Sequence, residues 1–105
     1  MGSVNLFDTE LRQRAIERVV YVYDYLQIEF SDDICLTINN KYSSIGGELK
    51  DFIGATVEKT EANADAFTIF FEANRQLSVG LADEDYYCPE AMVLHGGKYG
   101  TIVWQ

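Results

Sequence analysis

The sequence contains an internal repeat, which restricts the possible folds more than any other feature. Residues 16–38 align with residues 57–79 without a gap, at an offset of 41 residues. Identical residues in the two copies include Glu17 and Glu58, Ile28 and Ile69, Phe30 and Phe71, and Leu36 and Leu77. Two copies of one sequence segment predict two copies of one structural unit in a single chain.

Each copy has the pattern of three short antiparallel strands. Ile34, Leu36 and Ile38 alternate with less apolar residues, as in a strand with one buried face. The triplets 31–33 and 72–74 each lie between two such runs, as the turn of a hairpin does. The expected strands are 16–23, 25–30 and 34–39 in the first copy, and 54–60, 66–72 and 76–81 in the second. A last hairpin is expected from 91–95 and 101–105, around the glycine-rich turn 96–100.

The beginning of the chain fits two structures. Apolar residues between Leu11 and Leu26 recur at helical spacing. Residues 19–23, however, are β-branched or aromatic and favour a strand, whereas the composition of residues 8–15 favours a helix. We therefore expect a short helix at 8–15 that is followed by the first strand.

About eight strands and one terminal helix predict a mainly β fold of the α+β class. The expected architecture is an antiparallel β-sandwich or a partly open barrel with the helix on one face. A chain of 105 residues has the length of a single domain, so we assign residues 1–105 to one domain.

The charge balance restricts the possible partners. The chain has 17 acidic and 8 basic residues and a net charge of −9, which repels nucleic acids and anionic membrane surfaces and attracts basic proteins. Acidity that serves only solubility is the alternative. No apolar run approaches the ~20 residues that span a bilayer, and the two cysteines are too few for a disulfide framework. These features predict a cytoplasmic protein, with a bridge between Cys35 and Cys88 left open.

No residue pattern predicts catalysis or a bound cofactor. The only histidine, His95, and Cys88 both flank the last hairpin, but no third residue follows at a spacing that would orient them. The acidic run 83–85 lacks the alternating ligands of a calcium loop. We expect no metal and no cofactor, and we expect that the chain is not an enzyme; a hydrolase that uses Cys88 or the carboxylates is the weakest alternative.

Tyrosines and acidic residues provide the candidate binding residues. Tyr21, Tyr23 and Tyr25 are expected on one face of a strand, where they serve either the core or an interface. Near the end of the chain, acidic side chains that steer a basic partner adjoin aromatic rings that can anchor it. The expected contact residues are Asp83, Glu84, Asp85, Tyr86, Tyr87 and Glu90, with Asp32 and Asp33 as a second choice.

The last third of the chain resembles a group of small uncharacterised bacterial proteins. In those proteins an apolar strand runs into an acidic Asp-x-Asp-Tyr segment, a Pro-Glu-Ala and a closing Val-Trp strand, as residues 81–94 and 101–104 do here. This chain has Tyr87-Cys88 where a glycine before the proline is commoner. Some proteins of this kind are immunity partners of polymorphic or contact-dependent growth-inhibition toxins. The resemblance implies protein binding and brings no catalytic residues with it.

Together these features predict an immunity protein that covers the active site or the basic surface of a cognate toxin. The alternative is a small-molecule-binding module with its pocket inside a half-open barrel. An exposed edge strand could also pair two copies into a homo-oligomer.

Overall fold

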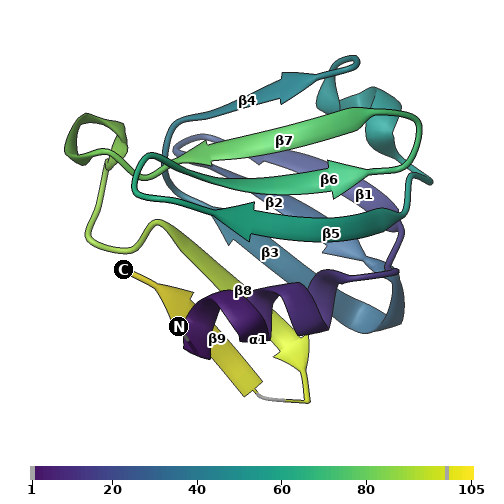
Figure 1. The fold of residues 1–105 in the computed structure, drawn as a ribbon, viewed down its shortest axis with the longest axis horizontal. Coiled ribbons are helices and arrows are strands. Elements are labelled where there is room, and N and C mark those ends of the chain that lie inside the picture. The colour runs from purple at the N-terminus through teal and green to yellow at the C-terminus, as the bar shows by residue number, and fades with distance from the viewer. Residues whose placement is uncertain (1, 99) are drawn as a thin grey trace.

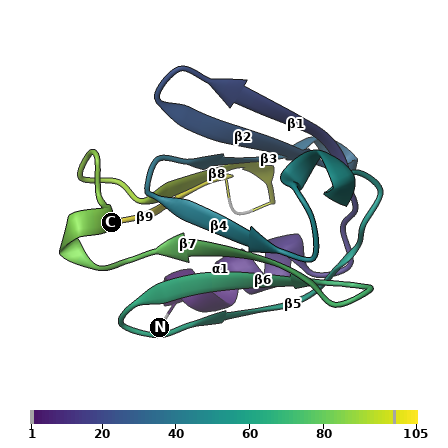
Figure 2. The same ribbon diagram turned by 90° about the horizontal axis from the view of Figure 1, so that it is seen from above.

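A computed structural model describes the backbone of residues 2–98 and 100–105, with side chains from residue 6 onward. Two antiparallel sheets pack face to face, and one helix lies beside them (Figures 1 and 2). The elements, in chain order, are α1 (Gly2–Leu11), β1 (Ile16–Val22), β2 (Tyr25–Phe30), η1 (Ser31–Asp33), β3 (Ile34–Ile38), β4 (Tyr42–Ile45), η2 (Leu49–Phe52), β5 (Val57–Ala62), β6 (Ala66–Phe71), β7 (Arg75–Gly80), η3 (Asp83–Asp85), β8 (Met92–Gly97) and β9 (Gly100–Trp104).

The two sheets confirm the predicted sandwich and its two meanders. The five-stranded sheet has the order β1-β2-β3-β8-β9, and the four-stranded sheet has the order β4-β7-β6-β5. Each copy of the repeat therefore contributes three consecutive strands to its own sheet. The sheets do not close into a barrel, so the sandwich is the correct form of the two that were expected.

Alternation along the strands produces the core. In β2, Leu26, Ile28 and Phe30 are buried while the residues between them are partly exposed, and β6 repeats this pattern. The inward side chains of both sheets meet in one hydrophobic cluster, because every second residue of a strand points to the same face.

Helix α1 closes one side of the sandwich. It packs against β5 and β9 (Figure 1). The ring of Phe7 contacts the rings of Phe67 and Trp104, with centroids 5.7 and 5.5 Å away.

The helix was expected at 8–15 but lies earlier, at Gly2–Leu11. It ends there because Gln13 has a φ of 69° and donates its N–H to the carbonyl of Val57, and Ala15 already pairs with Thr56. Tertiary pairing thus replaces the helical hydrogen bonds that the local composition favours.

Several expected strands differ in their bounds. Strand β4 was not expected, because Tyr-Ser-Ser-Ile has no apolar alternation. Strand β5 begins at Val57 rather than at 54, because Gly54 turns the chain with a φ of 91°. Strand β8 continues to Gly97 rather than ending at 95, so the turn before β9 is shorter than expected.

The two copies of the repeat share even their irregularities. The pairing of β1 with β2 shifts between Ile16 and Arg18, and the pairing of β5 with β6 shifts between Val57 and Lys59. The turn after β2 has two consecutive residues of φ near 64°, and the turn after β6 has two of φ near 62°. In every case the equivalent residues are 41 positions apart, so the sequence repeat is also a structural repeat.

The two copies of the repeat contact each other through residues at equivalent positions. Ala15 and Thr56, which occupy the same position in the two copies, form an isolated antiparallel bridge. Two hydrogen bonds flank this bridge. The N–H of Gln13 donates to the carbonyl of Val57 at 2.8 Å, and the equivalent residues of the other copy form the same bond, from the N–H of Gly54 to the carbonyl of Ile16 at 2.7 Å. The arrangement is that of a pseudo-two-fold axis through the bridge.

The copies also exchange a strand. Strand β4 follows β3 in the chain but pairs with β7, and β8 follows β7 but pairs with β3. The registers correspond, since Met92 lies opposite Ile38 as Tyr42 lies opposite Val79. Each exchanged strand has a glycine of positive φ at its C-terminal end: Gly46, directly after β4, at 96°, and Gly96, the last but one residue of β8, at 91°. Each half of the chain thus completes the other half's sheet.

Replacing Gly96 with alanine tests the close contact between strand β8 and the backbone of Asp33. The new Cβ would overlap the backbone carbonyl of Asp33, so overpacking of about 2 kcal/mol adds to about 1 kcal/mol of backbone strain. The control is Gly54→Ala, which has the same φ of 91° but no described heavy atom within 4 Å of its Cβ position. We expect urea denaturation to show a loss of about 3 kcal/mol for G96A and about 1 kcal/mol for G54A. Equal losses of unfolding free energy in the two variants would contradict a close contact between Gly96 and Asp33.

The attachment of α1 gives a pH-dependent prediction. Burial raises the pKa of Asp8, but hydrogen bonds from Thr60 and Arg12 outweigh burial and hold this pKa below its ordinary value of 3.8. The carboxylate accepts both the backbone N–H and the hydroxyl of Thr60, at 2.8 and 2.9 Å. Because the folded-state pKa is the lower one, the stabilisation is complete above the ordinary value and is lost as the pH falls through the folded-state pKa.

We therefore expect Asp8→Asn to lower the free energy of unfolding by about 1.5 kcal/mol at pH 7. The difference from the natural chain should shrink below about pH 4, as measured by denaturation across pH. Glu58→Gln, on the exposed face of β5, removes the same charge and should show a much smaller difference. A loss for D8N that stays constant with pH would contradict the ionic contribution.

Candidate functional site

Five of the seven tyrosines line one groove at an end of the sandwich. The turn between β1 and β2, the connection between β3 and β4, and the loop before β8 lie together at this end (Figures 1 and 2). They enclose two adjoining hollows of about 610 and 370 Å³. We call this surface the tyrosine groove; its main residues are Tyr21, Tyr23, Asp24, Tyr25, Asn39, Asn40, Lys41, Tyr42, Tyr87 and Cys88.

The rings in the groove are strongly exposed. Tyr23 is 98% exposed, Tyr87 70% and Tyr21 60%. Within the described chain, the five hydroxyls of the groove make no hydrogen bond and the five rings make no contact with another ring. Large exposed aromatic side chains of this kind are typical of protein-binding surfaces.

The groove exists because the first copy of the repeat departs from the second. In the second copy, β6 and β7 remain paired up to Ala66 and Gly80, and the N–H of Leu81 then closes the end by donating to the carbonyl of Asp65.

In the first copy, the pairing of β2 with β3 already stops at Leu26 and Ile38. The next two residues, Asn39 and Asn40, donate their N–H groups to the carbonyl of Ala91 instead, at 2.9 and 3.3 Å. The chain after β3 therefore turns towards β8 and leaves the β1–β2 turn, and the groove lies between them.

The second copy also shows which side chains the turn itself requires. Asp24 has an aspartate, Asp65, at the equivalent position, so the turn keeps this residue in both copies. The three tyrosines around it do not recur. The equivalent positions of Tyr21, Tyr23 and Tyr25 hold alanines, namely Ala62, Ala64 and Ala66. In the second copy the fold forms the equivalent turn without aromatic rings.

The three tyrosines do not share one face of a strand, as the alternation predicted. Tyr21 lies opposite Leu26, and Tyr25 lies opposite Val22. Directly opposed residues share a face, so Tyr21 is on the face of buried Leu26 and Tyr25 is on the other face. The expectation was wrong because the chain reverses at Tyr23 and Asp24. The rings converge on the groove from both sides of the turn.

The acidic loop adjoins the groove but contributes unevenly. Tyr87 lines the groove, and Tyr86 is half-buried and packs against the core. Asp83 and Glu84 are exposed, and Asp85 is half-buried. The loop is held by its backbone: the carbonyl of Asp85 accepts the N–H of Lys41, and the carbonyl of Glu90 accepts the side-chain amide of Asn39.

Negative charge at this end has no internal counterion. None of the ion pairs among the described residues involves Asp24, Asp83, Glu84, Asp85 or Glu90. Lys41 is the one cation lining the groove among these residues, and it also forms no ion pair.

Burial, together with the nearby Tyr21, raises the pKa of Tyr42, so its hydroxyl stays protonated and neutral at physiological pH.

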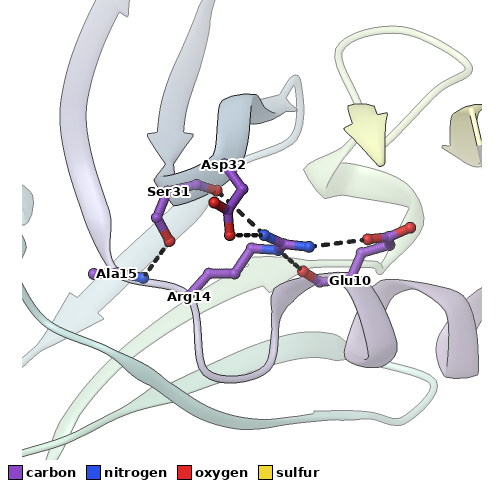
Figure 3. A network of polar contacts seen from close by, with 5 residues as sticks. All are labelled: Glu10, Arg14, Ala15, Ser31 and Asp32. Atoms are coloured by element: carbon purple, nitrogen blue, oxygen red, sulfur yellow. Dashed lines mark hydrogen bonds and ion pairs between the residues drawn. The ribbon is translucent and has the colours of Figure 1, made fainter. Parts of the chain in front are cut away.

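Asp32 and Asp33 lie at the opposite end of β3 from the groove. Both belong to η1, which begins the strand, whereas the groove begins where the strand ends. Asp32 accepts a hydrogen bond of 2.8 Å from Arg14, which also contacts Glu10 of α1 (Figure 3). Beside this network the N–H of Ala15 donates to the hydroxyl of Ser31 (Figure 3). The second-choice residues therefore belong to a different surface, and one of them has a structural partner.

Cys88 and His95 are not brought together. Cys88 lines the groove and donates its thiol to the carbonyl of Glu90, whereas His95 pairs across the sheet with Cys35 and contacts the hydroxyl of Thr101. Both cysteines are free. Among the described residues, no three histidine, cysteine or acidic side chains are grouped as metal ligands.

One polar group in the groove lacks a partner. Asn40 is 2% exposed, and its Nδ2 donates to the carbonyl of Gly80 at 2.7 Å. This bond fixes the orientation of the amide, and Oδ1 remains buried without a donor from the described chain. Buried acceptors are nearly always hydrogen-bonded, so this oxygen is an exception among the described residues.

Comparison of the chain with protein-family models, with curated proteins and with solved structures finds no match. In the described residues, no helix has the length and apolar character needed to cross a membrane. The site is therefore interpreted from its own residues.

Sequence reasoning missed most of the groove, since Tyr87 is the one main residue of the groove that was among the expected contact residues. Asp24, Asn39, Asn40, Lys41 and Tyr42 were not among the expected contact residues, although they line the groove. A usable signal was the comparison of the two copies, in which tyrosines alternate with a shared aspartate in one turn and alanines do so in the other.

The internal comparison predicts that the tyrosines are dispensable for stability. We expect the triple variant with Tyr21, Tyr23 and Tyr25 replaced by alanine to change the free energy of unfolding by less than about 1 kcal/mol, because surface substitutions cost little. Leu26→Ala, in the same hairpin but fully buried, should cost about 2–5 kcal/mol. Thermal or urea denaturation measures both. A large loss in the triple variant would show that the rings serve the fold.

Proposed function

We propose that this chain is a protein-binding domain that holds a basic partner protein in the tyrosine groove. The observation that carries the proposal is the presence of three exposed tyrosines where the second copy of the same turn has alanines. Alanine would satisfy the fold, so the rings represent exposed apolar surface with no structural benefit. Tyrosine is among the residues that contribute most to binding energy at protein interfaces.

Charge supports a basic partner. The groove and the adjoining loop carry five carboxylates that form no ion pair with the described part of the chain, and the net charge is −9. A field of this sign accelerates association with a positively charged protein and disfavours acidic competitors.

Within this class, we propose that the chain is an immunity protein acting in the cytoplasm. It would neutralise a basic toxin by covering its active site or its substrate-binding surface, without a cofactor and without catalysis. The resemblance of residues 81–94 and 101–104 to immunity partners supports this role, and Tyr87 of that segment lines the groove.

A small-molecule-binding module is the weaker candidate. It was expected to hold its ligand inside a half-open barrel, but the side chains of the hydrophobic cluster occupy the space between the two sheets. The hollows that line the tyrosine groove lie at the end of the sandwich, where a protein surface can reach them.

Co-expression with the product of the neighbouring reading frame tests the immunity proposal. We expect that product to be basic and to arrest growth alone, and we expect this chain to restore growth and to co-purify with it. The triple tyrosine variant should weaken the complex at least tenfold, as loss of interface anchors does, while remaining folded. A harmless neighbour that does not co-purify would contradict the proposal, as would full protection by the triple variant.

A further inference from the structure

We propose that the tyrosine groove recognises arginine side chains on an extended segment of the partner. The inference deepens the proposed function and rests on it for the identity of the partner. The preference for arginine comes from the geometry of the groove itself.

The groove offers aromatic faces that are free to stack. Tyr23, at the tip of the β1–β2 turn, and Tyr87, in the loop before β8, are the two most exposed of its rings. Both line the hollow of about 610 Å³, together with Tyr25 and Asp24. A planar guanidinium stacks on such faces through cation–π attraction, and arginine does so more often than lysine.

The groove also offers a carboxylate to a cation. Asp24 lies between two rings in the sequence of the turn, lines both hollows and forms no ion pair in the described chain. A guanidinium carries five N–H donors and no acceptor, so it matches both the stacking faces and the carboxylate of Asp24.

The shape of the groove favours a segment rather than one isolated side chain. The two hollows share the β1–β2 turn and Tyr87 and continue to Lys41 and Tyr42. Lys41 stands at the second hollow and repels a cation there, so the first hollow, next to Asp24, is the position for the guanidinium.

The test uses three blocked pentapeptides and the full chain. The probes are an acetylated, amidated peptide with arginine at its second and fourth positions between glycines, the same peptide with lysine, and the same peptide with uncharged citrulline. Backbone and tyrosine-ring NMR signals are followed during titration. We expect the arginine peptide to bind about two- to fivefold more tightly than the lysine peptide. The citrulline peptide should shift the signals least, and all shifts should centre on the β1–β2 turn and Tyr87.

Two matched variants locate the site. Asp24→Asn and Asp65→Asn make the same charge change at equivalent positions of the two turns. We expect D24N to weaken binding of the arginine peptide and D65N to leave it unchanged, and Tyr23→Ala to remove the preference for arginine over lysine. Equal effects of D24N and D65N, or equal affinity for the two cationic peptides, would overturn the inference.

The outcomes separate this inference from the proposed function. A chain that neutralises its partner but shows no arginine preference retains the proposed function and loses the guanidinium site. A chain that binds the arginine peptide in the groove, but whose neighbouring gene product is neither toxic nor bound, retains the site and loses the immunity role.

Discussion

The junction between the two copies of the repeat is the constraint on which the rest of the structure depends. Ala15 pairs with its own equivalent, Thr56, and symmetric backbone hydrogen bonds surround the pair. This pairing ends helix α1, sets where β1 and β5 begin, and brings the two meanders face to face. The exchanged strands β4 and β8 then tie each half to the other's sheet, so neither half holds its complete set of strands alone.

Duplication also makes the special features of the first copy visible by comparison with the second. Both copies contribute side chains to the core. In the second copy the turn around Asp65 has only small side chains, all alanines, at the positions that hold tyrosines in the first copy. The first copy has the same backbone requirements but carries tyrosines around Asp24. It also stops its β2–β3 pairing one residue pair earlier than the second copy stops β6–β7. The departure from symmetry therefore coincides with the exposed rings.

The carboxylates at the two ends of β3 differ in their ion pairing. At η1, Asp32 is paired with Arg14, which connects it to α1 (Figure 3). At the groove, the carboxylates form no ion pair with the described residues. Charge that is paired inside the fold therefore lies at one end of β3, and carboxylates without such a pair lie at the other.

The amino-acid sequence was enough to predict an antiparallel sandwich or a partly open barrel built from two meanders, because alternation indicates which side chains of a strand are buried and the repeat indicates how often the unit occurs. The structure decided between these two forms. Of the expected contact residues, Tyr87 lines the groove, and residues 83–85 belong to the adjoining loop. The sequence did not determine that α1 ends at Leu11, that β4 is a strand, or that Asn39 and Asn40 bond to Ala91. These depend on hydrogen bonds between residues far apart in the chain, which local propensity does not encode. Only the tertiary structure decided the groove, since its three walls come from distant segments and its opening depends on where one ladder of hydrogen bonds stops.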